Sequence, residues 1–195
     1  MRIAAILLAA GRGERFIGNK LLENYAGKPL YLHTLDLMLA AGFHQVVVVT
    51  QYQQIIAHVS GTRARAVHHP DPSLGISSSI RIGLQNCGVW DGVMFFVGDQ
   101  PHLSLHTVAG MIEMFKSEPS CIISAAYGDC PGNPVIFPWQ LKDELMALKG
   151  DIGGRAVIRN HPDMRRYYMV SNPVELKDID TREDLDNIAG SAVNE

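Results

Sequence analysis

The chain has 195 residues, and 17 Lys and Arg against 20 Asp and Glu give it a formal net charge of −3. Its length suits one globular domain, and a composition of 47% hydrophobic and 19% charged residues is ordinary for a folded, water-soluble protein. The sequence has no basic block and no run of about 18 apolar residues, which argues against nucleic acid and membrane as partners. Three scattered cysteines outside any CxxC spacing argue against a disulfide framework and a structural zinc site, so we expect a cytoplasmic protein.

Short apolar runs alternate with helical patterns along the chain. Ile3 to Leu8 is a continuous apolar run, as expected of a strand buried on both faces. A helical pattern over 30–41 and the run Val46 to Val49 complete a βαβ unit. The same reading predicts helices at 53–59, 77–87, 105–115 and 140–148 and from 181, and strands at 64–68, 92–97, 121–125, 134–137 and 166–170.

This alternation predicts an α/β fold. We expect a single domain over residues 1–195, built on a mostly parallel twisted sheet with helices on both faces and an antiparallel excursion in the second half. Ligands of such sheets bind outside the carboxyl ends of the strands. The loops to examine are therefore 9–20, after the first strand, and 98–102, after the strand that ends at Val97.

The first of these loops has the composition of a phosphate-binding loop. Glycines let backbone N–H groups approach anionic oxygens and basic side chains supply charge, and the loop contains Gly11, Gly13, Gly18, Arg12, Arg15 and Lys20. It matches neither familiar motif, because Phe16 replaces the third glycine of GxGxxG and Asn19 intervenes before the lysine of a P-loop. The alternative interpretation is a turn whose basic side chains are only solvated.

Without the hydroxyl of a P-loop, a magnesium ion needs a carboxylate from elsewhere. Asp99 follows directly on the apolar strand 93–97, and magnesium takes one or two carboxylates together with phosphate oxygens and water. The rival interpretation makes Asp99 a turn or capping residue before Pro101. Further along, Asp178 and Asp180 precede the capping signal of the last helix, and of the two we favour Asp180 as a second metal ligand.

Seven segments of the chain resemble the motifs of a known family and lie in the same order. They are LAAGRGERFIGNKLL at 8–22, GKPL at 27–30, GISSSIRIGL at 75–84, GDQP at 98–101, GNPVIF at 132–137, GDIGGR at 150–155 and DIDTREDL at 178–185. Together they resemble the MobA-like nucleotidyltransferases, and most closely the molybdenum cofactor cytidylyltransferases. The resemblance implies a Rossmann-like nucleotidyltransferase fold and an enzyme that joins the terminal phosphate of molybdopterin to the α-phosphate of a nucleoside triphosphate, releasing pyrophosphate.

The resemblance also implies roles for individual residues. Magnesium is the implied cofactor at Asp99, with Asp180 as the second ligand named above, and Arg15, Lys20 and Asp99 are the implied catalytic residues. The nucleotide-binding residues are Leu8, Ala9, Ala10, Gly11, Gly13, Arg15, Lys20, Gly75, Ser78 and Ser79, and His69 joins them as a candidate at a strand end. Attack of one phosphate on another needs positioning and charge neutralisation more than covalent help from side chains, which agrees with these residue types.

Two features bear on the substrates. Ala10 stands where guanylyltransferases of the family have glycine, and its methyl group narrows the space beside a purine, which favours CTP over the alternatives GTP and ATP. The acceptor candidates are Asn133, Asp151 and Arg155, and the segment 150–155 is either an anion-binding turn or a glycine-rich helix start without a ligand. Transfer to another phosphorylated acceptor stays open, as does a non-catalytic nucleotide- or pterin-binding protein that serves a molybdoenzyme or its chaperone.

Overall fold

The strands form where the sequence has apolar and β-branched runs. The computed structural model describes residues 1–11 and 19–185. Its strands are β1 (Ile3–Ala9), β2 (Asn24–Tyr25), β3 (Lys28–Pro29), β4 (Gln45–Thr50), β5 (Arg65–His68), β6 (Gly92–Val97), β7 (Ile122–Tyr127), β8 (Cys130–Pro138) and β9 (Arg165–Met169). The four valines of β4 are fully buried, as expected for a central strand of a parallel sheet.

Helices alternate with these strands. They are α1 (Leu30–Ala40), α2 (Gln53–Val59), α3 (Ile76–Gln85), α4 (Leu105–Ser117), α5 (Lys142–Met146) and α6 (Arg155–Asn160). Local chemistry marks their starts: Ser104 caps α4 by accepting a hydrogen bond from Thr107 N at 3.1 Å, and Gly75 precedes α3. Within the described part of the chain, none of these helices has the length and apolar character needed to cross a membrane.

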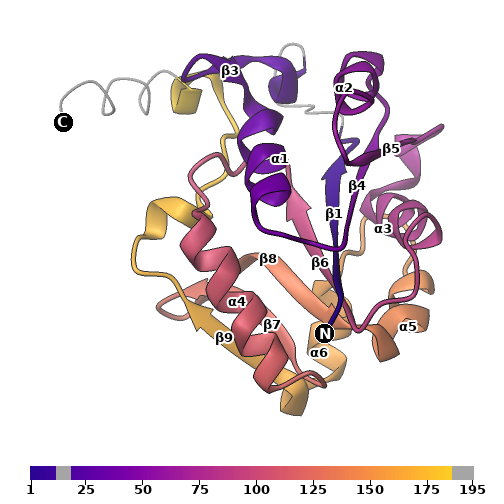
Figure 1. Cartoon of the computed structure of the whole chain (residues 1–195), viewed down its shortest axis with the longest axis vertical. Coiled ribbons are helices and arrows are strands. Elements are labelled where there is room, and N and C mark those ends of the chain that lie inside the picture. The colour runs from indigo at the N-terminus through magenta and orange to yellow at the C-terminus, as the bar shows by residue number, and fades with distance from the viewer. Residues whose placement is uncertain (12–18, 186–195) are drawn as a thin grey trace.

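Seven of the described strands form one sheet in the order β5-β4-β1-β6-β8-β7-β9 (Figure 1). The pairs β1–β4, β1–β6, β4–β5 and β7–β9 are parallel, whereas β8 runs antiparallel to β6 and β7. From β1 the chain first builds outward to β4 and β5, and then crosses to β6 on the other side of β1. This reversal makes the carboxyl ends of β1 and β6 the crevice where such sheets bind ligands.

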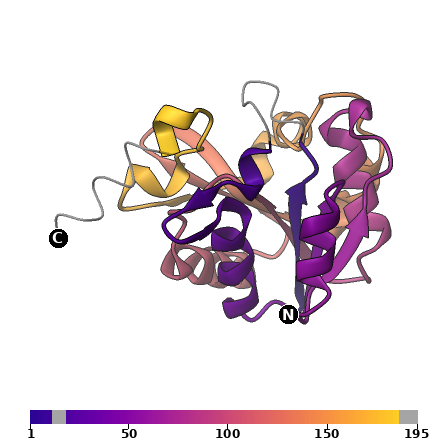
Figure 2. The ribbon, with the colours of Figure 1, turned by 90° about the horizontal axis from the view of Figure 1, so that it is seen from above.

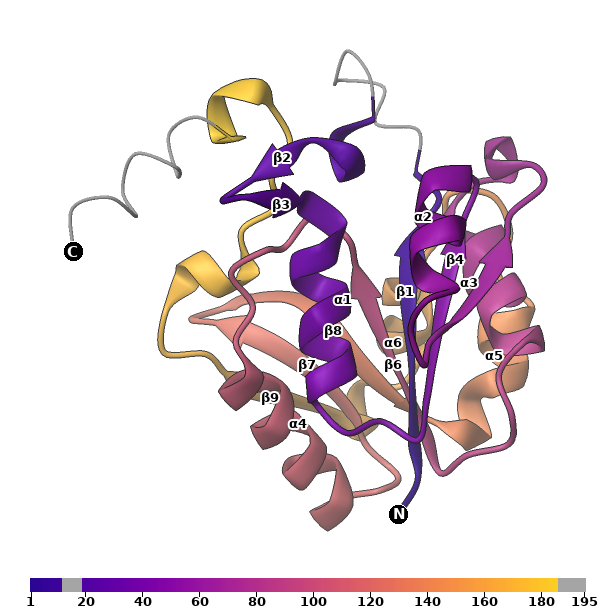
Figure 3. The same cartoon turned by 45° about the horizontal axis from the view of Figure 1, so that its top comes forward.

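Helices cover both faces of the sheet. One apolar core packs α1, α2 and α4 against alternate residues of the strands, and the other packs α3, α5 and α6 against the opposite face. Figure 3 shows α1 and α4 in front of the sheet, and Figure 2 shows the same ribbon from above. The helices therefore hold the strands while leaving this edge open to loops.

A downstream segment returns to the same edge. Ile179 is fully buried against Tyr25 and Leu30, beside the small β2–β3 hairpin, and its N–H donates to the Asp99 carbonyl at 2.9 Å. Figures 1 and 3 both show this yellow segment next to β2 and β3. Residues 178–180 thus lie beside a loop that is about 80 residues earlier in the sequence.

The predicted architecture is confirmed. The sheet is mostly parallel with helices on both faces, and the antiparallel excursion is β8. Each predicted strand and helix that ends before residue 171 is present, with the helix expected at 140–148 reduced to α5 after a short 3-10 turn (Trp139–Leu141). Sequence reading left α6 only as one of two alternatives and did not predict the β2–β3 hairpin, because both are too short to show a periodic pattern.

Candidate functional site

The open edge of the sheet carries a cleft of about 450 Å³. The loop after β1, the loop after β6 and the start of α3 converge on it. Its lining includes most of the residues that the sequence predicts for nucleotide binding, namely Leu8, Ala10, Gly11, Lys20, Gly75 and Ser79, together with the predicted metal ligand Asp99. Gly13 and Arg15 lie outside the described residues, so their predicted roles stay predictions.

Two residues after β4 hold the start of the glycine loop, and sequence reasoning missed both. Gln51 Nε2 donates to the Ala10 carbonyl at 2.8 Å, and the Tyr52 hydroxyl donates to the Gly11 carbonyl at 2.6 Å. These bonds occupy carbonyl oxygens, which leaves the N–H side of the turn for an anion. Their position directly after a buried strand at the ligand-binding edge is the signal that would have identified them.

Lys20 joins two carboxylates from distant segments. Its Nζ lies 2.7 Å from Asp99 Oδ2 and 2.9 Å from Asp180 Oδ1, and it also donates to the Ile179 carbonyl at 3.0 Å. Burial by itself would lower the pKa of Lys20, but the charges of Asp99 and Asp180 raise it above its ordinary value. The lysine is therefore a fixed cation between two carboxylates at the sheet edge.

The neighbouring Asp178 has a different environment. Its Oδ1 accepts a hydrogen bond from Gln100 Nε2 at 2.8 Å, and Gln100 is itself buried. Burial, together with the nearby charge of Asp99, raises the pKa of Asp178. Of the two aspartates considered from the sequence, the structure thus brings Asp180 to the Lys20–Asp99 pair and ties Asp178 to the loop after β6.

The two carboxylates fit a hard divalent cation. Asp99 lines the cleft, and its Oδ1 is buried without a hydrogen-bond partner among the described residues, so this oxygen is left to coordinate an ion. In the same residues no group of three or more His, Cys, Asp or Glu side chains is arranged to hold a metal. A cation here would therefore take one or two carboxylates and complete its shell with ligand oxygens and water, which is the pattern magnesium prefers.

His69 and Ser78 lie behind the cleft and do not line it. His69 Nε2 is 2.7 Å from Ser78 Oγ, and Ser78 Oγ donates to the Gly75 carbonyl at 2.6 Å. Both side chains are buried, and His69 Nδ1 has no partner in the described part of the chain. The predicted contact of these two residues with a nucleotide is therefore indirect in this geometry: they hold Gly75, which does line the cleft.

Replacing His69 with glutamine is expected to make the fold less sensitive to mild acid. Burial lowers the pKa of His69 below its ordinary 6.5, because a proton on Nδ1 would create a charge without a partner. The neutral ring therefore contributes stability that is fully present above the unfolded-state pKa of about 6.5. This stability is lost as the pH falls from there through the lower pKa of the folded state. Urea unfolding between about pH 8 and pH 5 measures this loss as a fall in the free energy of unfolding. If that free energy changes with pH equally in the wild type and the variant, the prediction is wrong.

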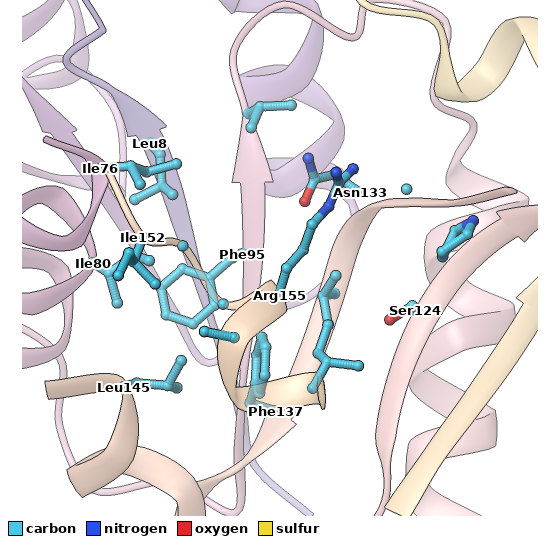
Figure 4. Close-up of a pocket in the computed structure, with 18 of the residues that line it drawn as sticks. Leu8, Ile76, Ile80, Phe95, Ser124, Asn133, Phe137, Leu145, Ile152 and Arg155 are labelled. Atoms are coloured by element: carbon cyan, nitrogen blue, oxygen red, sulfur yellow. The ribbon is translucent and has the colours of Figure 1, made fainter. Parts of the chain in front are cut away.

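A larger apolar cavity of about 640 Å³ adjoins the cleft (Figure 4). The two share Leu8, Ile76, Val97 and Asp151 as lining residues, so they lie side by side. The acceptor candidates predicted from the sequence, Asn133, Asp151 and Arg155, all line this cavity. The rest of its lining is mostly apolar and includes Phe95, Phe137, Ile80, Leu145 and Ile152. Figure 4 shows Arg155 extending from α6 toward Asn133 on β8.

The segment 150–155 both starts a helix and lines the cavity. Gly154 precedes α6, and a Cβ atom built there would lie 2.9 Å from Phe137 Cζ, so only glycine lets this turn pack on the aromatic ring. The Gly150 carbonyl accepts a hydrogen bond from Ser77 N at 3.1 Å. The segment is therefore a glycine-rich helix start, and because Asp151 and Arg155 line the cavity, its role as an anion-binding turn stays a prediction.

Residues 5–165 match the MobA-like NTP transferase domain. The chain belongs to this family. Among MobA-like relatives, it is 30% identical to nicotine blue oxidoreductase of Paenarthrobacter nicotinovorans, over 95% of this chain and 93% of that protein. It is 32% identical to the bifunctional protein GlmU of Sphingopyxis alaskensis over 75% of this chain, which covers 33% of that longer protein.

Solved structures show the same fold. Rv0371c of Mycobacterium tuberculosis superposes with a TM-score of 0.84 at 26% identity, covering 97% of this MobA-like chain and 98% of that one. The same protein was also solved in complex with manganese, with a TM-score of 0.81 at 25% identity, covering 98% of this chain and 100% of that one. A nucleotidyl transferase from Methanothermobacter has a TM-score of 0.84 at 24% identity, over 98% of each chain. The fold and family are thus shown by full-length matches.

Proposed function

We propose that the protein transfers a nucleoside monophosphate, in the first place CMP from CTP, to the terminal phosphate of molybdopterin and releases pyrophosphate. The observation that carries this proposal is the pair of adjoining hollows. A cleft with a glycine turn, Lys20 and Asp99 in its lining lies beside an apolar cavity lined by Asn133 and Arg155, and Lys20 also pairs with Asp180. The cleft suits a triphosphate, and the cavity suits an organic molecule that carries the attacking phosphate.

In this reaction an oxygen of the acceptor phosphate forms a bond to the α-phosphorus of the nucleotide. The bond from that phosphorus to the bridging oxygen breaks, and pyrophosphate leaves with the electron pair. A phosphate monoester is already ionised near neutral pH, so no side chain has to remove a proton. The protein therefore contributes position and charge: backbone N–H groups of the glycine turn and Lys20 for the leaving phosphates, and Arg155 for the incoming one.

Asp99 and Asp180 are the residues that would hold magnesium. When bound, such an ion neutralises phosphate oxygens and makes the α-phosphorus more electrophilic. Lys20 already balances both carboxylates in this structure, and its 2.7 Å contact keeps the Asp99 side chain at the cleft. The choice of CTP is supported by Ala10, which is buried and lines the cleft, so that its methyl group limits the room for a purine.

A substrate screen tests the proposal. Purified protein is incubated with magnesium and CTP, GTP or ATP, against molybdopterin and against sugar phosphates, and released pyrophosphate is measured. We expect release with CTP and molybdopterin, and at most slow release with the other pairs. Binding of CTP and molybdopterin without release from any pair would overturn the transferase proposal in favour of a carrier.

An oxidoreductase is the second candidate, because the chain is 30% identical to nicotine blue oxidoreductase over nearly the full length of both proteins. The same cleft would then hold a nicotinamide nucleotide, and the apolar cavity would hold the compound to be reduced. Incubation with a reduced nicotinamide nucleotide and nicotine blue, followed by absorbance, tests this candidate. If the Asp99→Asn variant still bleaches nicotine blue and the wild type releases no pyrophosphate, the oxidoreductase is favoured over the nucleotidyltransferase.

A further inference from the structure

The apolar cavity continues beyond the acceptor candidates into a slot between α6 and β9. Arg155 and Arg159 lie four residues apart and so share one face of α6, and Arg165 and Tyr167 lie two apart on one face of β9. All four line the cavity, as does Ser124 of β7, which pairs with Tyr167. Four of these five, all but Arg155, have no role in the function proposed above.

Ser124 is an unusual residue for such a surface. It is 1% exposed, and its Oγ has no hydrogen-bond partner among the described residues. Burying a hydroxyl without a hydrogen-bond partner is unfavourable, so such groups usually meet a ligand or an ordered water. The β7–β8 register shifts between Ser124 and Ala126, as in the bulges that often re-aim side chains beside active sites. Figure 4 shows the Ser124 oxygen directed toward Arg155.

The charge around the slot is positive. In residues 1–11 and 19–185, no ion pair is found for Arg155, Arg159 or Arg165. The guanidinium of Arg165 lies 5.4 Å from the centre of the Tyr167 ring, which holds it against an aromatic surface. Asp151, at the other end, is the only carboxylate among the described residues that line the cavity, in a chain whose net charge is −3. An anion is therefore the ligand that this end of the cavity suits.

The slot is far from the cleft. Leu8 lies on β1 and Ser124 on β7, which are three strand positions apart in the sheet, and β9 is one strand further. Strands are spaced about 4.7–4.9 Å apart, so about 14 Å separates β1 from β7 and about 19 Å separates it from β9. A single phosphate group cannot span that distance. One ligand that reaches both ends must be elongated.

We propose that this slot is a second anion-binding site for the acceptor, remote from the phosphate that receives the nucleotide. The acceptor class would be an elongated molecule with an aromatic or apolar body and an anionic group at its far end. Arg159 and Arg165 bind that anion, Ser124 Oγ hydrogen-bonds to a polar atom of the body, and Tyr167 packs on it. The inference rests on the proposed function in placing the acceptor in this cavity.

Naphthalene sulfonate, a fluorescent aromatic anion, tests the slot without any turnover. Fluorescence titration should show saturable binding to the wild type. Arg159→Gln and Arg165→Gln together should weaken it at least about tenfold, and Ser124→Ala about threefold to tenfold. Arg65→Gln is the matched control, because Arg65 opens β5 at the opposite end of the sheet, and it should leave binding unchanged.

Thermal unfolding separates a binding role of Ser124 from a structural one. Among the described residues its hydroxyl has no partner to lose, so Ser124→Ala should keep or raise the melting temperature while weakening binding of the probe. A fall in melting temperature with unchanged probe affinity would overturn the inference, as would full affinity in the double arginine variant. The proposed function fails by a different result: the wild type would release no pyrophosphate with any substrate pair.

Discussion

Asp99→Asn should reduce nucleotidyl transfer by about 10²–10³-fold, the loss typical when one charge-stabilising group is removed from an active site. The substitution keeps the size of the side chain and removes the charge that pairs with Lys20 at 2.7 Å. It also replaces a carboxylate, one oxygen of which is buried without a hydrogen-bond partner among the described residues, by a neutral amide that binds divalent cations more weakly. Pyrophosphate release under saturating substrates measures the effect on turnover.

Manganese binding gives a readout of Asp99→Asn that does not depend on turnover. Titration followed by the spectrum of the free ion should show weaker binding than in the wild type. The fold should survive, because the backbone bond from Ile179 N to the Asp99 carbonyl remains and Lys20 keeps Asp180. Asp163→Asn, an exposed change outside the cleft, is the control. Wild-type activity and manganese affinity in Asp99→Asn would contradict the assignment.

Gly75→Ala should destabilise the protein by about 2–5 kcal/mol. Gly75 has φ +78° and ψ 177°, a conformation that is essentially restricted to glycine. A Cβ atom there would lie 2.4 Å from the carbonyl carbon and oxygen of Gly150 and 2.6 Å from Asp151 Oδ1. Since the contact is with the backbone of Gly150, this part of the chain has to move. Urea unfolding measures the loss.

Gly42→Ala is the matched control for this prediction. Gly42 has φ +76°, close to the value for Gly75, but a Cβ atom there would meet nothing within 4 Å. It should therefore show only the cost of a left-handed conformation, about 1–2 kcal/mol. If both variants lower the free energy of unfolding equally, the close packing of Gly75 on Gly150 does not contribute to stability. We also expect Gly75→Ala, but not Gly42→Ala, to raise the KM for nucleotide.

Much of the fold follows from local sequence patterns. The valine run of β4 and the apolar run of β1 are recognisable because a strand buried on both faces has to be apolar throughout. The alternation of such runs with helical patterns implies parallel crossovers, and these put the loops after β1 and β6 at one edge. That Asp99 and Lys20 share a site could therefore be inferred without coordinates.

Short elements and long-range contacts gave weaker signals. The helix α6 has six residues after a glycine-rich turn, too few for a periodic pattern to separate it from a loop. Gln51 and Tyr52 act through backbone carbonyls of the glycine loop, and any polar residue after a strand has the same appearance in sequence. His69 looked like a ligand-binding residue, but burial and its bond to Ser78 place it behind the cleft.

By itself, the sequence determined the fold class, the edge of the sheet that carries the site, and the residue types available there. All three depend on interactions within a few residues or one crossover. Only the tertiary structure decided that Asp180 and not Asp178 meets Lys20, and that Ser124 faces the same cavity as Arg159 and Arg165. These groups come from segments far apart in the chain, and their meeting depends on how helices and strand edges pack, which no local pattern encodes.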